Sequence, residues 1–251
     1  MPFALELAAV GVVIGIAVGC TGIGGILLVP ILAYGFGLGV AQSVAIALLS
    51  YLPSGVVAIW LYARYGSIDW RSGLPLCLAA CPAALLGAYA ASVAPRGVLE
   101  IMVALLLVLG GVSALFPMRM SSAASRTLRP PVIAGLGVVT GFISAMSGAG
   151  GALVLLPMLL LLDQAVLPSI GLGQLIQFPI AAVATAANLA AGSVDVTLGA
   201  ELAVSLAAGI VIGTPIAHAL PQVMLRRVLG VALLAVGLLL LGQVGWRQIA
   251  A

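Results

Sequence analysis

Charged side chains are scarce in this sequence. They make up 6% of its 251 residues, as six acidic residues and nine arginines with no lysine, whereas about 25% is usual in soluble domains. None occurs between residues 7 and 63, a stretch long enough to cross a bilayer. With 64% hydrophobic residues and a mean hydropathy of +1.35, the chain is expected to be an all-α polytopic membrane protein, with the lipid bilayer around it. It offers no basic face to nucleic acid.

Histidine and cysteine are also rare. The chain has one histidine, His218, and three cysteines, an odd number in an apolar setting. A metal centre needs several ligands, and a hydrolase needs a nucleophile with a base beside it. One isolated histidine supplies neither, so we expect no metal, no cofactor and no enzymatic activity.

Glycine, by contrast, is abundant and is clustered twice. TGIGG occupies residues 21–25 and SGAGG residues 147–151, and a proline follows each cluster, at Pro30 and Pro157. Because glycine costs a helix about 1 kcal/mol relative to alanine, we expect the first and fifth apolar segments to break within the membrane. Irregular backbone at that depth is tolerated only inside protein or beside a water-filled cavity, so a pair of breaks indicates a transport site.

The two glycine clusters belong to an internal repeat. Gly148 corresponds to Gly22 at an offset of 126 residues, and Pro179 corresponds to Pro53 at the same offset. Random apolar sequence would rarely preserve such a frame of glycines and prolines. We therefore expect two homologous halves of four apolar segments each. Their bounds are residues 1–117 and 131–251, with a polar and basic linker at 118–130.

Duplication allows two arrangements of the halves, parallel or inverted. The arginines favour inversion, which places seven of them on one side and two on the other, against six and three for the parallel arrangement. In the inverted arrangement, each glycine-broken segment enters and returns on its own side. The linker is then cytoplasmic and both termini lie outside. We expect the protein in the cell membrane, which in bacteria is the inner membrane.

The same residues carry a family resemblance. GCTGIGGILLVP and SGAGGALVLLP, with GSID and GSVD after the second segment of each half, resemble the TauE/SafE sulfite exporter family over essentially the whole chain. The resemblance implies a small duplicated membrane carrier. It also implies that the substrate is a small anion, sulfite or an organosulfonate, and that the direction is export. Composition alone does not name a substrate.

We expect the anion to bind at the two breaks. A helix that restarts after glycine presents unpaired N–H groups and the positive end of its dipole, and the neighbouring threonine and serine can add hydroxyl donors. The alternative is that the small residues only let helices pack closely. The candidate residues are Thr21, Gly22, Gly24 and Gly25 in the first break and Ser147, Gly148, Gly150 and Gly151 in the second.

Polar side chains in the second segment of each half are further candidates. Ser50 and Tyr51 lie in the first half, while Gln174 and Gln177 lie three residues apart on one helical face in the second half. Tyr51 and Gln177 are equivalent under the repeat, whereas Gln174 corresponds to Leu48. Hydrogen bonding between helices is the alternative role for these side chains.

Three carboxylates are candidates for coupling proton movement to transport. Asp69 and Asp195 each follow a Gly-Ser pair at the start of a segment, so we expect them to cap helices. Glu201, which lies near the membrane boundary, is the better candidate for coupling.

The sequence therefore predicts a secondary transporter for a small anion. The alternative is a channel for a small neutral solute, in which the breaks would line a continuous pore. A membrane enzyme is a more remote alternative. Both a monomer and a homo-oligomer are compatible with the sequence, because nothing in it fixes the number of subunits.

Overall fold

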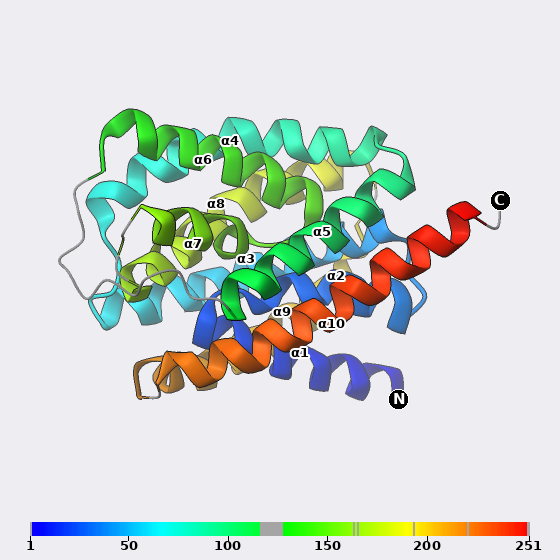
Figure 1. The fold of residues 1–251 in the computed structure, drawn as a ribbon, viewed down its shortest axis with the longest axis horizontal. Helices are drawn as coiled ribbons and strands as arrows, with labels where there is room; N and C mark the ends of the chain where they lie inside the picture. Colours follow the sequence, from blue (N-terminus) through cyan, green and yellow to red (C-terminus); the bar gives the residue numbers. More distant parts are fainter. Residues whose placement is uncertain are drawn as a thin grey trace.

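The computed structural model describes residues 2–115, 128–162, 164, 166–192, 194–219 and 221–249, and every regular element among them is helical (Figure 1). Before residue 116 the chain forms α1 (Pro2–Thr21), the short helices η1 (Gly24–Leu27), α2 (Leu28–Pro30) and η2 (Ile31–Gly35), then α3 (Val40–Arg64), α4 (Trp70–Val93) and α5 (Arg96–Leu115). After residue 127 it forms α6 (Pro130–Ser147), α7 (Gly151–Leu161), α8 (Val166–Ala190), α9 (Val196–Ala219) and α10 (Gln222–Ile249). Most of the predicted linker, residues 118–127, lies outside the described residues.

The described helices have the length and composition of membrane spans. Five of them are long and apolar enough to cross a bilayer, namely Val40–Arg64, Trp70–Val93, Pro130–Ser147, Leu167–Ala190 and Val196–Ala219. Shorter apolar helices cover Leu5–Thr21, Gly24–Gly35, Gly97–Val112 and Leu233–Gly242. Large apolar side chains such as Leu5 and Leu78 are exposed, as expected of a surface that faces lipid. The prediction of an all-helical membrane protein is confirmed.

Both predicted helix breaks are present. α1 ends at Thr21 and α6 ends at Ser147, which are equivalent positions in the repeat. The next residue in each case, Gly22 or Gly148, has a left-handed backbone with φ of +75° or +67°. A side chain is strained in that conformation, so glycine is favoured. The chain therefore leaves the helix at the same point in each half.

Helices of one half pack against helices of the other through reciprocal contacts. α1 approaches α9 so closely at Gly15 that a Cβ atom there would collide with the carbonyl oxygen of Leu206. α6 approaches α4 in the same way at Gly141, where a Cβ atom would collide with the carbonyl oxygen of Ala80. Gly141 follows Gly15 by 126 residues, and Leu206 follows Ala80 by the same number. The pairs α1–α9 and α6–α4 are thus equivalent contacts.

Helices α1, α3 and α9 run in the same direction. Between α1 and α9, Gly11 contacts Ser205 and Gly19 contacts Thr214. Between α3 and α9, Leu49 contacts Gly199 and Tyr62 contacts His218. In both pairs the residue numbers rise together, which happens only when the two helices are parallel.

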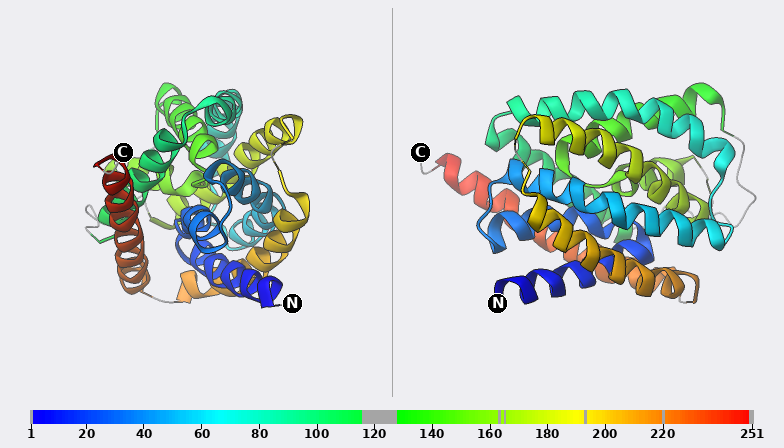
Figure 2. Two further views of the ribbon diagram at one scale, coloured as in Figure 1. Left: turned by 90° about the vertical axis from the view of Figure 1, so that its right-hand side faces the viewer. Right: turned by 180° about the vertical axis from the view of Figure 1, so that it is seen from behind.

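Helices α4, α6 and α8 run together in the opposite direction. Between α4 and α6, Leu76 contacts Gly137 and Gly87 contacts Phe142. Between α4 and α8, Gly73 lies beside Leu172, and Tyr89 and Asn188 line the same cavity further along both helices. A short connection, residues 65–69, turns the chain back between α3 and α4 at one end of the bundle (Figure 2). The direction of α4, and of the helices parallel to it, is therefore opposite to that of α3.

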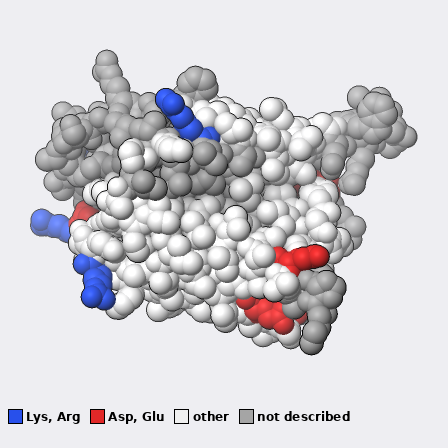
Figure 3. Space-filling view, turned by 90° about the horizontal axis from the view of Figure 1, so that it is seen from below, with Lys and Arg blue, Asp and Glu red and all other residues white. Residues whose placement is uncertain are grey.

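The two ends of the bundle differ in charge. Arg64 ends α3 and Arg71 lies in the first turn of α4, so both lie at one end. Glu6, Asp195 and Glu201 lie near the starts of α1 and α9, which is the other end. Figure 3 shows basic atoms toward one end and most acidic atoms toward the other, with a broad uncharged surface between them. The helices thus carry their charges on either side of an apolar band.

Candidate functional site

The first break is closed by hydrogen bonds of its own residues. The Gly22 amide donates to the Val18 carbonyl oxygen at 2.8 Å. The Thr21 hydroxyl donates to the Ala17 carbonyl oxygen at 2.9 Å and accepts from the Ile23 amide at 3.3 Å. The threonine therefore holds the end of α1 in shape, and its hydroxyl hydrogen is already engaged in this conformation.

The second break repeats this arrangement. The Gly148 amide donates to the Ser144 carbonyl oxygen at 3.0 Å. The Ser147 hydroxyl donates to the Ile143 carbonyl oxygen at 2.7 Å and accepts from the Ala149 amide at 3.2 Å. Thr21 and Ser147 thus occupy equivalent places, as the repeat predicts, and each hydroxyl contacts the backbone of its own break.

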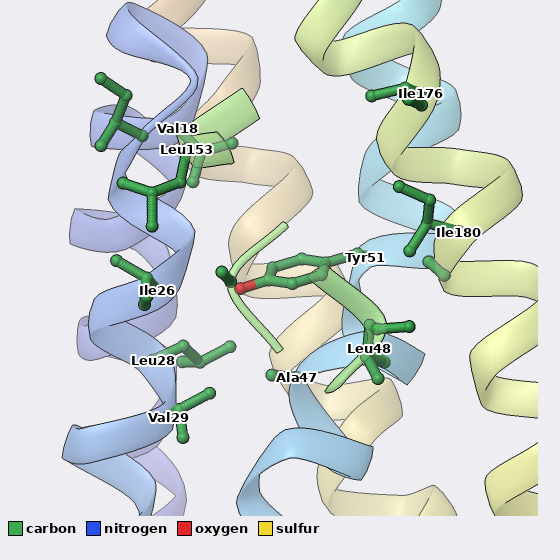
Figure 4. Packing of buried hydrophobic residues seen from close by; sticks show 14 of the residues in the cluster. Val18, Ile26, Leu28, Val29, Ala47, Leu48, Tyr51, Leu153, Ile176 and Ile180 are labelled. Carbon is green, nitrogen blue, oxygen red and sulfur yellow. The ribbon is translucent and has the colours of Figure 1, made fainter. Parts of the chain in front are cut away.

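A single side chain, Tyr51 of α3, connects the two breaks. Its hydroxyl donates to the carbonyl oxygen of Gly25 at 2.6 Å and lies 3.4 Å from the carbonyl oxygen of Gly148. The side chain is 1% exposed. Figure 4 shows the ring between the segment that carries Ile26 and helix α8, with its oxygen directed toward the first break. The two breaks, far apart in sequence, therefore meet in the interior of the bundle.

Helix α8 sends one amide side chain to each break. The Gln174 side-chain nitrogen donates to the Val18 carbonyl oxygen, in the last turn of α1, at 2.8 Å. The Gln177 side-chain oxygen lies beside Gly150, where an added Cβ atom would be 3.2 Å away. Both glutamines are buried. Tyr51 and the two glutamines thus form a polar centre around both breaks.

The remaining glycines of the breaks lie at tight contacts. A Cβ atom on Gly25 would be 2.7 Å from the Tyr51 hydroxyl. A Cβ atom on Gly24 would be 2.6 Å from the Ala17 methyl group, and one on Gly151 would collide with the Ile176 side chain. The absence of side chains at these positions lets the breaks approach the surrounding helices.

Two other predicted candidates lie apart from this centre. The Ser50 hydroxyl is buried and donates within its own helix to the Ala47 carbonyl oxygen at 2.7 Å, so its hydrogen is used within α3 and not at a break. Glu201 lies on an exposed face of α9, in its second turn. The structure therefore brings together the two breaks, Tyr51 and the glutamines, but not Glu201.

The capping role predicted for the two aspartates is confirmed. The Asp69 carboxylate accepts a hydrogen bond from the Arg71 amide at 3.1 Å at the start of α4. The Asp195 carboxylate accepts from the amides of Thr197 and Leu198 at 3.0 and 3.1 Å at the start of α9. Both side chains thereby satisfy N–H groups that have no partner within the helix.

The polar centre is closed to solvent in this conformation. Thr21, Ser147, Tyr51, Gln174 and Gln177 are all at most 3% exposed. Open cavities lie elsewhere. One of about 300 Å³ lies between α4 and α8, and a wider depression of about 810 Å³ lies between the starts of α3 and α9. Any ligand at the breaks must therefore enter through a change of conformation.

Sequence reasoning missed an aromatic cluster at the arginine-rich end. His218 stacks on Tyr65 at 4.1 Å between ring centroids, and its Nε2 atom lies 3.2 Å from the Ser67 hydroxyl. Tyr62, beside His218, donates to the Gly19 carbonyl oxygen at 2.8 Å. The cluster joins α9 to α1 and α3. The repeat offered a signal, because the positions equivalent to Tyr62, Tyr65 and His218 hold the small residues Asn188, Ala191 and Ser92.

Paired breaks at a buried polar centre, inside a helical bundle with an apolar surface, define the class of polytopic membrane transporters. Within the described residues, no group of three or more His, Cys, Asp or Glu side chains could hold a metal ion. The family model described as Sulfite exporter TauE/SafE matches residues 7–240. The chain therefore belongs to this family of sulfur-anion exporters, as the resemblance in its sequence predicted. Searches of curated proteins and of solved structures found no match.

Proposed function

We propose that this protein is a carrier that exports a small sulfur oxyanion, sulfite or an organosulfonate, and binds it between the two helix breaks. The observation that carries this proposal is the meeting of both breaks at one buried hydroxyl, that of Tyr51. Family membership supports the substrate class. The buried polar groups around the breaks support the place of binding.

The helix breaks offer an anion N–H donors and a positive helix end, which lipid does not provide. Helix α7 restarts at Gly151, and the first turn of a helix has N–H groups without helical partners and the positive end of the helix dipole. The site lies at the level of the membrane midplane, because Tyr51 and Gln177 each occupy the twelfth position of a 25-residue helix. Midplane sites at broken helices are typical of secondary transporters.

We infer that the two halves, residues 1–117 and 131–251 joined by 118–130, are inverted repeats. In support of this, α1 and α3 run opposite to their counterparts α6 and α8. Since α1 and α3 run the same way, the chain between them has to return across the bundle. That is the behaviour of a broken segment that enters and leaves on its own side.

The orientation follows from the charges at the two ends. Arg64 and Arg71 lie at the end where the linker joins α6, whereas Glu6 and Glu201 lie at the other. Because Lys and Arg are enriched on the cytoplasmic side of membrane proteins, the arginine-rich end faces the cytoplasm. Both termini and the acidic end then face outward across the cytoplasmic membrane.

The contact region, or seam, between α3 and α9 differs from the equivalent seam between α8 and α4, and this difference indicates the access route. At the cytoplasmic end, Tyr62, Tyr65 and His218 fill the seam between α3 and α9. At the outer end, the equivalent seam between α8 and α4 leaves the 300 Å³ cavity, lined by Asn188 and Ser92 among others. The described conformation thus has a filled seam at the inner end and a cavity in the equivalent seam at the outer end. Alternating access requires a second conformation in which the aromatic cluster separates.

Counterflow in proteoliposomes tests the proposal. Vesicles loaded with excess unlabelled sulfite should concentrate labelled sulfite transiently, because a carrier couples exit of one anion to entry of another. Uptake should saturate, and protein-free vesicles provide the control. Non-saturating flux without counterflow would support a channel, and transport of neutral solutes but not sulfite would overturn the proposal. Recovery of intact sulfite excludes an enzymatic reaction.

A further inference from the structure

We propose that Gln174 selects the protonated form of the substrate, hydrogen sulfite, by accepting a hydrogen bond from its acidic hydrogen. This inference rests on the proposed function and names the ionic form that the site takes. The feature that carries it is the side-chain oxygen of Gln174, which is fully buried and has no hydrogen-bond donor among the described residues.

The orientation of this amide is fixed by its other end. The Gln174 side-chain nitrogen donates to the Val18 carbonyl oxygen at 2.8 Å. Turning the amide over would place its oxygen against that carbonyl oxygen, and two acceptors repel each other. The oxygen is therefore the end that is left without a partner.

The amide also lies at the first break and is not required by the scaffold. A Cβ atom on Gly22 would be 4.0 Å from the Gln174 side-chain nitrogen. In the first half of the repeat, the equivalent position is Leu48, which is buried and apolar. The same framework thus accepts leucine, so the buried amide calls for a different explanation.

Two other buried oxygens without a partner do not carry the same argument. The hydroxyl groups of Thr140 and Thr185 are unpaired among the described residues. A hydroxyl hydrogen can rotate, and the threonine side chain can bond to a carbonyl oxygen of its own helix. An amide oxygen has no hydrogen to donate, so only an incoming donor can satisfy Gln174.

The chemistry of the unpaired oxygen distinguishes the two forms of sulfite. The dianion carries only acceptors, and its oxygens would be repelled by the Gln174 oxygen. Hydrogen sulfite carries one hydrogen that can be donated, while its remaining oxygens can accept from backbone N–H groups. Transport of this form carries a proton along with the substrate. The exposed carboxylate of Glu201 is then not required for proton coupling.

The direction of the internal pH change tests which form is carried. Proteoliposomes with an internal pH dye receive sulfite at the same neutral pH inside and outside, with potassium and valinomycin to clamp the potential. Hydrogen sulfite that enters loses protons inside, so the lumen should become more acidic. Entry of the dianion alone would make the lumen more alkaline and would overturn the inference while leaving the proposed function intact. Absence of any sulfite uptake would instead overturn the proposed function.

Substitution of Gln174 separates its role from a proton carried elsewhere. Methanesulfonate, a monoanion without a hydrogen to donate, serves as the comparison ligand. In Gln174→Leu, we expect the affinity for sulfite below neutral pH to fall roughly tenfold, since a hydrogen bond to a charged group is lost. Inhibition by methanesulfonate should not weaken, because this anion, like the sulfite dianion, presents only acceptors to the Gln174 oxygen. If leucine prevents folding, Gln174→Met keeps the length of the side chain without the acceptor.

Thr185→Val is the matched control, because it removes another unpaired buried oxygen from the same helix. It should leave both affinities unchanged. Equal loss of sulfite and methanesulfonate binding in Gln174→Leu would reduce Gln174 to a general role in the site and overturn the inference. Unchanged binding of both would show that only a buried water meets this oxygen, with the same consequence.

Discussion

Tyr51 is the residue on which the two breaks depend. Its hydroxyl donates to Gly25, and the same hydroxyl would be 2.7 Å from a Cβ atom at that glycine. The tyrosine therefore both requires glycine at position 25 and satisfies its carbonyl oxygen. Neither function is visible in a single sequence, because the two residues belong to different apolar segments.

A double-mutant cycle between Gly25 and Tyr51 tests this dependence. We expect Gly25→Ala to cost about 1–3 kcal/mol through overpacking. Tyr51→Phe should cost about 0.5–1.5 kcal/mol through the lost hydrogen bond. The double variant should be less destabilised than the sum, because the hydroxyl that collides with the new methyl group is gone. Thermal unfolding in detergent measures this, and strictly additive effects would contradict the contact.

The hydroxyls of Thr21 and Ser147 should matter moderately and equally. Each bonds to the backbone of its own break, so Thr21→Ala and Ser147→Ala should each cost about 0.5–1.5 kcal/mol of stability. We expect sulfite affinity to weaken by less than about tenfold in either variant. Complete loss of binding in a variant of normal thermal stability would contradict this role, because it would make the hydroxyl a direct ligand.

Among the elements, the pairs α1–α9 and α6–α4 join helices that precede the predicted linker to helices that follow it. α1 meets α9 at Gly15, and α6 meets α4 at Gly141, and each glycine faces a carbonyl oxygen of the partner helix. Gly15→Ala and Gly141→Ala should therefore destabilise the protein by similar amounts, about 1–3 kcal/mol each. Gly135→Ala is the control, since Gly135 on α6 has open space around it.

The comparison between these variants is made by the melting temperature of each purified protein. A marked fall for Gly15→Ala with none for Gly141→Ala would contradict the equivalence of the two pairs. Because alanine favours a helix more than glycine does, Gly135→Ala should leave the melting temperature unchanged or raise it. A fall of the same size for Gly135→Ala would show that the losses at Gly15 and Gly141 do not report close packing.

The elements were largely predictable from the sequence, and their contacts were not. The position of α3 followed from an apolar run between glycine and arginine, and the breaks followed from clustered glycines. The contacts of His218 were not predicted, because its hydrogen-bond partner Ser67 lies 151 residues earlier in the chain, although the repeat marks the aromatic positions as different from their equivalents. The same limit explains Ser50, a polar residue in the expected helix whose hydroxyl bonds within its own turn.

For the whole molecule, the proposed inverted arrangement and orientation predict which positions are reached from outside the cell. In a variant without the three native cysteines, a cysteine at Ala123 should react with an impermeant reagent only after the cells are permeabilised. A cysteine at Thr197, an exposed position near the acidic end, should react in intact cells. Labelling of Ala123→Cys from outside, or protection of Thr197→Cys, would contradict the proposed orientation.

If one anion binds between the two breaks, its position in a crystal can be located directly. Selenite, the selenium analogue of sulfite, can be soaked into crystals of the cysteine-free protein after competition with sulfite has been shown. We expect one strong anomalous peak between the two breaks, beside Tyr51, close enough for the selenite oxygens to hydrogen-bond to the break residues and Gln174. A peak only in the cavity near Asn188, with none between the breaks, would contradict it.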